Sequence, residues 1–236
     1  MDDAQAALQV FPVRGLPEIA PGADLAGMIN DAFDLQDGDV IVVTQKIVSK
    51  AEDRFVAVDH NDPVAKRALA ESEAVRVLRR RGEMVITETR HGFICANSGV
   101  DLSNVEDGYA LLLPLDPDRS ARRIRDALRG RASVEVGVII SDTFGRVWRR
   151  GLTDVAIGTA GIAAVVDLRG QADAMGRELL VTEVCVADEI AGAAELVMGK
   201  ASGVPVAVVR GVEAAWLRES SVHDEIVRLP DEDLFR

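Results

Sequence analysis

The sequence is poor in the residues on which several common kinds of chemistry depend. Its two cysteines, Cys95 and Cys185, lie far apart and outside any CxxC pattern, so we expect both to be buried as small apolar side chains. The three histidines, at positions 60, 91 and 223, form neither HxxxH nor HExxH, which argues against a zinc hydrolase. There is no GxxxxGK(S/T) loop and no GxGxxG after a strand, so any nucleotide site must be unconventional.

Long apolar runs and an excess of basic charge are absent as well. No segment approaches the roughly 20 apolar residues that cross a bilayer, and the acidic start Met1-Asp2-Asp3 lacks the features of a secretion signal. We therefore expect a cytoplasmic protein without a membrane partner. The net charge of -12 disfavours a nucleic-acid partner, because such proteins need a basic surface to release counterions from phosphates. An anionic ligand would need local arginine, lysine or metal charge.

Strand-like and helix-like segments alternate irregularly along the 236 residues, of which 48% are hydrophobic and 28% charged, as in a globular protein. β-branched and apolar runs predict strands at 8–13, 39–44, 83–89, 92–96, 110–115, 134–140, 155–157, 163–168 and 204–209. Helical spacing of apolar residues predicts helices at 24–33, 63–80, 120–129 and 183–198. The order lacks a regular βαβ rhythm, which favours an α+β fold with mixed sheets and flanking helices. No linker interrupts residues 1–236, which form one domain or two coupled lobes.

The most informative segment runs from Ser141 to Gly151 and joins an apolar strand to an acid, a hydroxyl and three arginines. Asp142 follows the predicted strand at its end, where a sheet presents functional loops, and its carboxylate can hold a divalent cation. Arg146, Arg149 and Arg150 are candidates for clamping phosphate or carboxylate oxygens. Trp148, between them, either belongs to the core or shelters a planar ligand.

A second polar segment, Asn97 to Asn104, follows another predicted strand and is rich in oxygen ligands. Mg²⁺ and Mn²⁺ prefer such ligands, but Asn, Ser, Gly and Asp are also the usual residues of a plain turn. Asp101 and Asp142 together make a candidate split metal site. A third segment, Thr44 to Glu52, places Lys46 and Lys50 near a strand end, where each either binds a polyphosphate or is an ordinary solvated lysine.

Six blocks of sequence in this order resemble the coenzyme F420-0:L-glutamate ligase family, over nearly the whole chain. They are residues 10–19, 37–52, 97–104, 111–118, 141–151 and 185–190. The resemblance implies an α+β fold forming an intertwined homodimer without a P-loop. It also implies an enzyme that uses GTP to add L-glutamate to the lactyl carboxylate of F420-0, and then extends a tail of γ-linked glutamates. Mg²⁺ or Mn²⁺, two ions per site, is the implied metal, with K⁺ as a further candidate.

The resemblance also assigns roles to individual residues. Asp101 and Asp142 would bind one divalent metal, Thr143 would help to bind a second, and Arg146 joins the two aspartates as a catalytic candidate. The residues implied to contact the nucleotide are Leu16, Pro17, Glu18, Ile19, Gln45, Lys46, Lys50, Asn104 and Lys200. The turn from Leu16 to Ile19 would lie near the guanine, and the loop from Gly199 to Pro205 near the phosphates.

The chain departs from some archaeal members of the family at Lys200-Ala201-Ser202, where those members have an acidic residue and a longer glycine-rich insert. This difference bears on the ligands of the second metal, and Lys200 can instead supply charge to a phosphate oxygen. The tail from Leu229 to Arg236 resembles the junction to a nitroreductase-like, flavin-binding domain that follows this domain in actinobacterial relatives. Two other functions stay open: a metal-dependent phosphohydrolase using the same residues, and a non-catalytic deazaflavin-binding module.

Overall fold

The computed structural model describes residues 7–234. The acidic start at residues 1–3 and the last two residues of the tail lie outside the described part. The strands are β1 Gln9–Val13, β2 Val40–Thr44, β3 Phe55–Ala57, β4 Ala74–Arg81, β5 Met84–Thr89, β6 Ile94–Ala96, β7 Tyr109–Leu111, β8 Gly137–Arg146, β9 Arg149–Ala160, β10 Val166–Asp167, β11 Glu183–Val184 and β12 Val206–Arg210. The α-helices are α1 Leu25–Ala32, α2 Gln45–Ala51, α3 Pro63–Ser72, α4 Pro117–Ala132, α5 Val186–Met198 and α6 Val222–Glu225.

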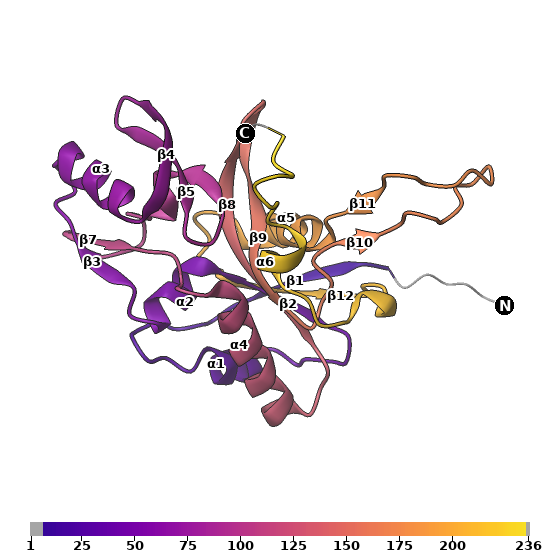
Figure 1. Ribbon diagram of the computed structural model, residues 1–236. Coiled ribbons are helices and arrows are strands. Elements are labelled where there is room, and N and C mark those ends of the chain that lie inside the picture. Colours follow the sequence, from indigo (N-terminus) through magenta and orange to yellow (C-terminus); the bar gives the residue numbers. More distant parts are fainter. Residues whose placement is uncertain (1–6, 235–236) are drawn as a thin grey trace.

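A five-stranded sheet in the order β1-β12-β2-β8-β9 forms the core of the molecule (Figure 1). Its inner strands are runs of β-branched residues: Val40 to Val43 and Val206 to Val209 are almost free of solvent contact. Strands buried on both faces need such continuous apolar sequence. The pair β2 and β8 is parallel and the other pairs are antiparallel, so the sheet is mixed, as the sequence predicts.

Two helices pack against the edge strand β9 and close the core. Helix α4 begins with Pro117 after Asp116, whose carboxylate accepts a hydrogen bond from Arg119 N, and it ends at Ser133 in the left-handed conformation. Helix α5 also packs on β1 and β12. A smaller layer, made of the sheet β4-β5-β6, the pair β3-β7 and helix α3, lies beside the main sheet (Figure 1).

Two predicted helices are wrong in part. The helix expected over residues 63–80 ends at Ser72, and the residues from Ala74 onward form β4, which pairs with β5. The alternation around Val75 and Val77 fits a strand, and pairing with a neighbouring strand outweighs the helical spacing. The helix expected over 183–198 begins only at Val186, because Glu183–Val184 pairs as β11 with β10.

The largest correction concerns β8 and β9. Residue 142 was expected just past the end of a strand over 134–140, but β8 extends to Arg146 and forms a long hairpin with β9. This hairpin and the β10–β11 arm both project from the body (Figure 1). The strands expected at 110–115 and 163–168 are shorter, at Tyr109–Leu111 and Val166–Asp167.

None of the helices between residues 7 and 234 has the length and apolar character that spanning a membrane requires.

Candidate functional site

The candidate site forms where the parallel strands β2 and β8 run side by side toward their carboxyl ends. Thr44, the last residue of β2, pairs with Ser141 of β8. After β2 the chain turns directly into α2, which starts at Gln45, whereas β8 continues to Asp142 and beyond. The fold therefore brings Lys46 of α2 close to Asp142, and the Lys46 charge lowers the pKa of that carboxyl.

Asp101 reaches the same place from another part of the chain. Its backbone is bonded to Leu111 of β7 in both directions, at 2.9 and 2.8 Å. Its carboxylate accepts hydrogen bonds from the backbone N–H and hydroxyl of Ser103, at 2.8 and 2.7 Å, and forms an ion pair with Lys46. Asp101 also raises the pKa of Asp142. The structure thus brings together the two aspartates that the sequence singles out, with Lys46 acting on both.

Asp142 has an unusual electrostatic environment. The pKa of its carboxyl is raised to about 7: burial raises it most, the charges of Asp101 and Asp154 add to that, and the Thr143 N–H and Lys46 lower it. Asp101 and Asp154 thus add negative charge near Asp142, which Lys46 and Lys200 offset in part. A divalent cation would relieve this repulsion, so Asp101 and Asp142 fit one such ion.

Asp154 is the functional candidate that the sequence reasoning missed. It pairs with Thr143 across the hairpin and is 3% exposed. Its carboxylate accepts hydrogen bonds from Thr143 Oγ1 at 2.6 Å, Lys200 Nζ at 2.7 Å and Ser141 Oγ at 3.2 Å. An acid directly before a run of small and β-branched residues, Val155 to Ala160, is a recognisable sequence signal. The spacing alone does not place it against residue 143, because that requires knowing that β8 continues past Ile140.

The residues expected to bind nucleotide are distributed around this point. Lys50, 7% exposed, forms an ion pair with Glu18 of the turn at residues 16–19. Gln45 is 1% exposed; its Oε1 accepts from Ser49 Oγ at 2.9 Å, and its Nε2 has no partner among the described residues. A buried donor without a partner is costly unless a ligand or water satisfies it. Asn104 is exposed and left-handed, with φ of 57°.

The three arginines of the hairpin lie elsewhere. All are exposed near its tip, and Arg146 Nη2 donates to Arg150 O at 3.0 Å. Trp148 is 81% exposed, so it is not a core residue, whereas Trp216 packs against the core. Within the chain, the structure groups Asp101 with Asp142 but leaves Arg146 apart from them.

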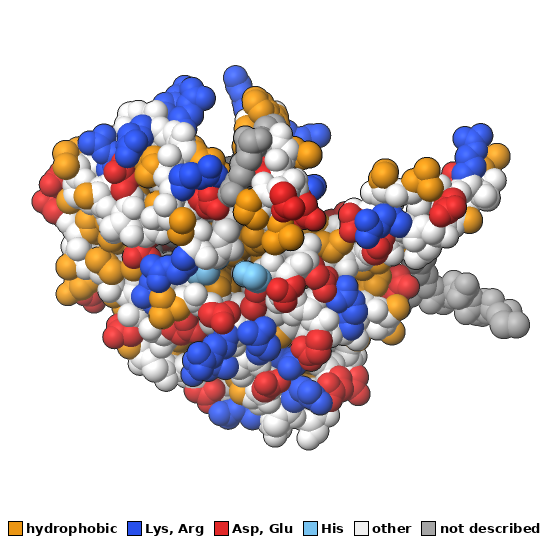
Figure 2. Space-filling model, in the orientation of Figure 1, with side chains coloured by type: hydrophobic (Ala, Val, Ile, Leu, Met, Phe, Trp, Pro, Cys, Tyr) orange, Lys and Arg blue, Asp and Glu red, His pale blue; other side chains and the backbone are white. Residues whose placement is uncertain are grey.

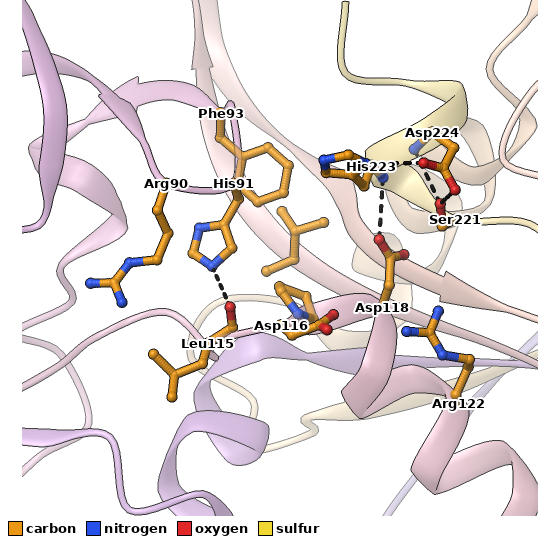
Figure 3. Close-up of a pocket in the computed structure, with 12 residues that line it drawn as sticks. Arg90, His91, Phe93, Leu115, Asp116, Asp118, Arg122, Ser221, His223 and Asp224 are labelled. Atoms are coloured by element: carbon orange, nitrogen blue, oxygen red, sulfur yellow. Dashed lines mark hydrogen bonds and ion pairs between the residues drawn. The ribbon is translucent and has the colours of Figure 1, made fainter.

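A pocket of about 490 Å³ lies between the loop at residues 90–93 and the start of α4 (Figure 3). Arg90, His91 and Phe93 lie on one side of it, and Asp118 and Arg122 on the other, as Figure 3 shows. The rings of His91 and Phe93 stack at 5.3 Å. Phe93 in turn meets the edge of Phe144, two residues after Asp142, with centroids 6.2 Å apart. The contact between Phe93 and Phe144 therefore links the lining of the pocket to the strand that carries Asp142.

His91 gives this pocket a buried hydrogen-bond acceptor. Burial lowers the pKa of its ring, even though the Pro114 and Leu115 carbonyls favour the protonated form. The neutral ring donates Nε2–H to these two oxygens, at 2.9 and 3.2 Å. Its Nδ1 is buried and has no partner among the described residues, so a ligand donor can satisfy it.

Neither cysteine is bonded to another. Cys95 is buried, and burial together with the charge of Asp142 raises the pKa of its thiol to about 12. Cys185 is only half-buried, which corrects the expectation for that residue. Across residues 7–234, no three side chains of the His, Cys, Asp and Glu types form a ready-made metal cage. A metal at Asp101 and Asp142 would thus need ligand oxygens to complete its coordination, as is usual for Mg²⁺ bound with phosphates.

Comparison with known proteins agrees with the sequence resemblance. The family model described as F420-0:Gamma-glutamyl ligase matches residues 15–211. The chain is 41% identical to the "Coenzyme F420:L-glutamate ligase" of Methanopyrus kandleri, with 97% of this chain and 98% of that protein covered. It is 41% identical to the protein of the same name from Methanothermobacter thermautotrophicus (97% and 99% covered). The one from Archaeoglobus fulgidus is 42% identical (97% and 96% covered).

Proposed function

The chain belongs to the F420-0:gamma-glutamyl ligase family and is a ligase, and we propose that it joins L-glutamate to the lactyl carboxylate of F420-0 at the expense of GTP. Repeated rounds would extend a γ-linked glutamate tail. The observation that carries the proposal is the convergence of Asp101 and Asp142 beside Lys46 at the end of the parallel strands.

The chemistry explains why such a site is needed. A carboxylate is a poor electrophile, so an acceptor carboxylate oxygen first attacks the γ-phosphorus of GTP, and GDP leaves. The glutamate amine then attacks the carbonyl carbon of the acyl phosphate, loses a proton, and inorganic phosphate leaves. Mg²⁺ or Mn²⁺ held by Asp101 and Asp142 would neutralise charge on the phosphate oxygens. Lys46 and Lys50 add fixed positive charge to a chain whose net charge is -12.

We propose that the acceptor F420-0 occupies the pocket whose Phe93 contacts Phe144 of β8. The stacked pair of His91 and Phe93 suits a planar ring, and Arg122, whose charge lowers the pKa of Asp224, adds a cation to the lining. Replacing Arg122 with Ala should raise the KM for F420-0 about tenfold, because a charge-assisted contact to the acceptor's phosphodiester is lost. The KM for GTP should not change. Arg123→Ala, at the exposed neighbouring position of α4, is the matched control.

We further propose that the protein acts as a homodimer held together by its two projecting arms. Side chains at the tip of the β8–β9 hairpin and along the β10–β11 arm are apolar and largely exposed. They are Val147 (80%), Trp148 (81%), Leu152 (68%), Met175 (82%), Leu180 (72%) and Val181 (85%). Figure 2 shows apolar side chains along both arms. Exposed apolar surface of this kind marks a protein interface. In such a dimer the hairpin of one subunit would bring its Arg146 to the carboxylate site of the other subunit.

One assay separates this function from its alternatives. The purified chain is incubated with F420-0, L-glutamate, GTP and Mn²⁺, and the products are weighed by mass spectrometry. The proposal predicts a ladder of products that differ by one glutamate, with GDP release that depends on glutamate. GTP hydrolysis without glutamate dependence would identify a phosphohydrolase. Binding of F420-0 without any turnover would identify a carrier.

A further inference from the structure

The ammonium group of Lys200 contacts three side-chain oxygen atoms beside β8, although the Lys200 side chain is 55% exposed. Nζ donates to Asp154 Oδ1 at 2.7 Å and to Thr143 Oγ1, and it forms an ion pair with Glu195 Oε1 at 3.0 Å. An ammonium has three N–H donors, so these three oxygens use all of them. The arrangement depends on Gly199, whose φ of 60° ends α5 and turns the next residue back toward the hairpin.

The oxygens around this ammonium are the types that a divalent cation selects. Two are carboxylate oxygens and one is a hydroxyl oxygen, as in many Mg²⁺ and Mn²⁺ sites. The Thr143 hydroxyl accepts from Lys200 and donates to Asp154, so it is committed on both sides. The implied second metal was expected to use this hydroxyl. A divalent ion there would lie against the ammonium, and like charges repel.

This cluster adjoins the first site, because the charge of Asp154 also raises the pKa of Asp142. Successive side chains of a strand point to opposite faces, so Asp142 and Thr143 face different surroundings. Asp142 lies in the field of Asp101 and Lys46, whereas Thr143 contacts Asp154 and Lys200. The pKa of Lys200 is raised: partial burial would lower it, but Asp154 and Glu195 more than offset that effect, so the group stays charged.

We propose that the Lys200 ammonium takes the place of a second divalent cation, so that each site of this ligase holds one metal ion, at Asp101 and Asp142, and one fixed protein cation. Asp154 and Glu195 are positioning residues that hold the ammonium, and Thr143 is its third contact. This inference rests on the proposed function for the site, and it differs from the expectation of two metal ions and of Thr143 as a metal ligand, which remains a prediction.

Counting bound ions tests this directly and needs no turnover. The protein, saturated with GDP, is dialysed against Mn²⁺, and the metal bound per bound nucleotide is measured. The wild type should hold one ion. Lys200→Ala frees the oxygens of Asp154, Glu195 and Thr143, and should hold two at the same Mn²⁺ concentration. Lys66→Ala, a surface lysine paired with Glu83, is the matched control and should stay at one. Lys200→Gln replaces the alanine variant if circular dichroism shows that the latter is unfolded.

The possible counts have separate meanings. Two ions in the wild type, or one ion in both the wild type and the Lys200 variant, would overturn the inference while the ligase function stands. A wild type that binds no ion would rule out metal binding by Asp101 and Asp142, and the inference with it. The glutamate ladder assay tests the ligase function independently of this count. The turnover rate complements the ion count. At low Mn²⁺ the rate of Lys200→Ala should be at least tenfold below that of the wild type, and excess Mn²⁺ should restore it.

Discussion

Burial of Asp142 disfavours its charged carboxylate, and a bound metal ion would offset that cost. If it holds the metal, Asp142→Asn should lower the ligase rate at least about a hundredfold, because a Lewis acid contributes several kcal/mol to charge stabilisation in the transition state. The rate is measured by glutamate-dependent GDP release. Asp31→Asn, in the exposed part of α1, should leave it unchanged. Metal-dependent turnover that survived in Asp142→Asn would contradict the assignment.

The same residue predicts how the stability of the metal-free protein depends on pH. The pKa of Asp142 is raised from 3.8 to about 7, so the fold favours the protonated carboxyl. Its stabilising effect is complete below about pH 4 and is lost as the pH rises through 7, by a few kcal/mol at most. In the presence of a chelator, Asp142→Asn should therefore unfold at a higher temperature than the wild type at pH 8. A wild type that lost no stability relative to the variant between pH 4 and 8 would refute the raised pKa.

At the scale of elements, the contact between α4 and β9 depends on a missing side chain. A Cβ at Gly158 would lie 2.4 Å from the backbone of Pro117, so Gly158→Ala should destabilise the protein by about 1–3 kcal/mol or more through overpacking. Gly130→Ala is the matched control inside α4, where a Cβ meets nothing within 4 Å and alanine favours the helix by about 0.5–1 kcal/mol. Urea unfolding of both variants measures the two opposite effects.

The sequence predicts the elements whose pattern is set locally. Short apolar runs rich in Val and Ile identify β2 and β12, and Asp62 before Pro63 marks the start of α3 correctly. The sequence cannot show where β8 ends, because its polar residues up to Arg146 are held by pairing with β9 and not by burial. For that reason Asp142 is predicted as a candidate, while Asp154 is found only when the hairpin register is known. Ion pairs between distant segments, such as Glu18 with Lys50, are equally invisible to spacing.

At the scale of the whole molecule, the two arms expose apolar side chains although the chain carries a net charge of -12. Like charges on an acidic surface make copies of the chain repel one another. Burial of the exposed apolar side chains of the arms would offset this repulsion when two copies associate. Trp148→Glu should therefore shift the protein from dimer to monomer in light scattering at micromolar concentration, because it places a charge in the buried centre of the contact. Leu196→Glu, equally exposed at 86% but on α5 in the body, should not. If Arg146 acts on the partner's site, the monomer should lose turnover while keeping GTP affinity. A wild-type protein that is already monomeric would contradict the proposed dimer.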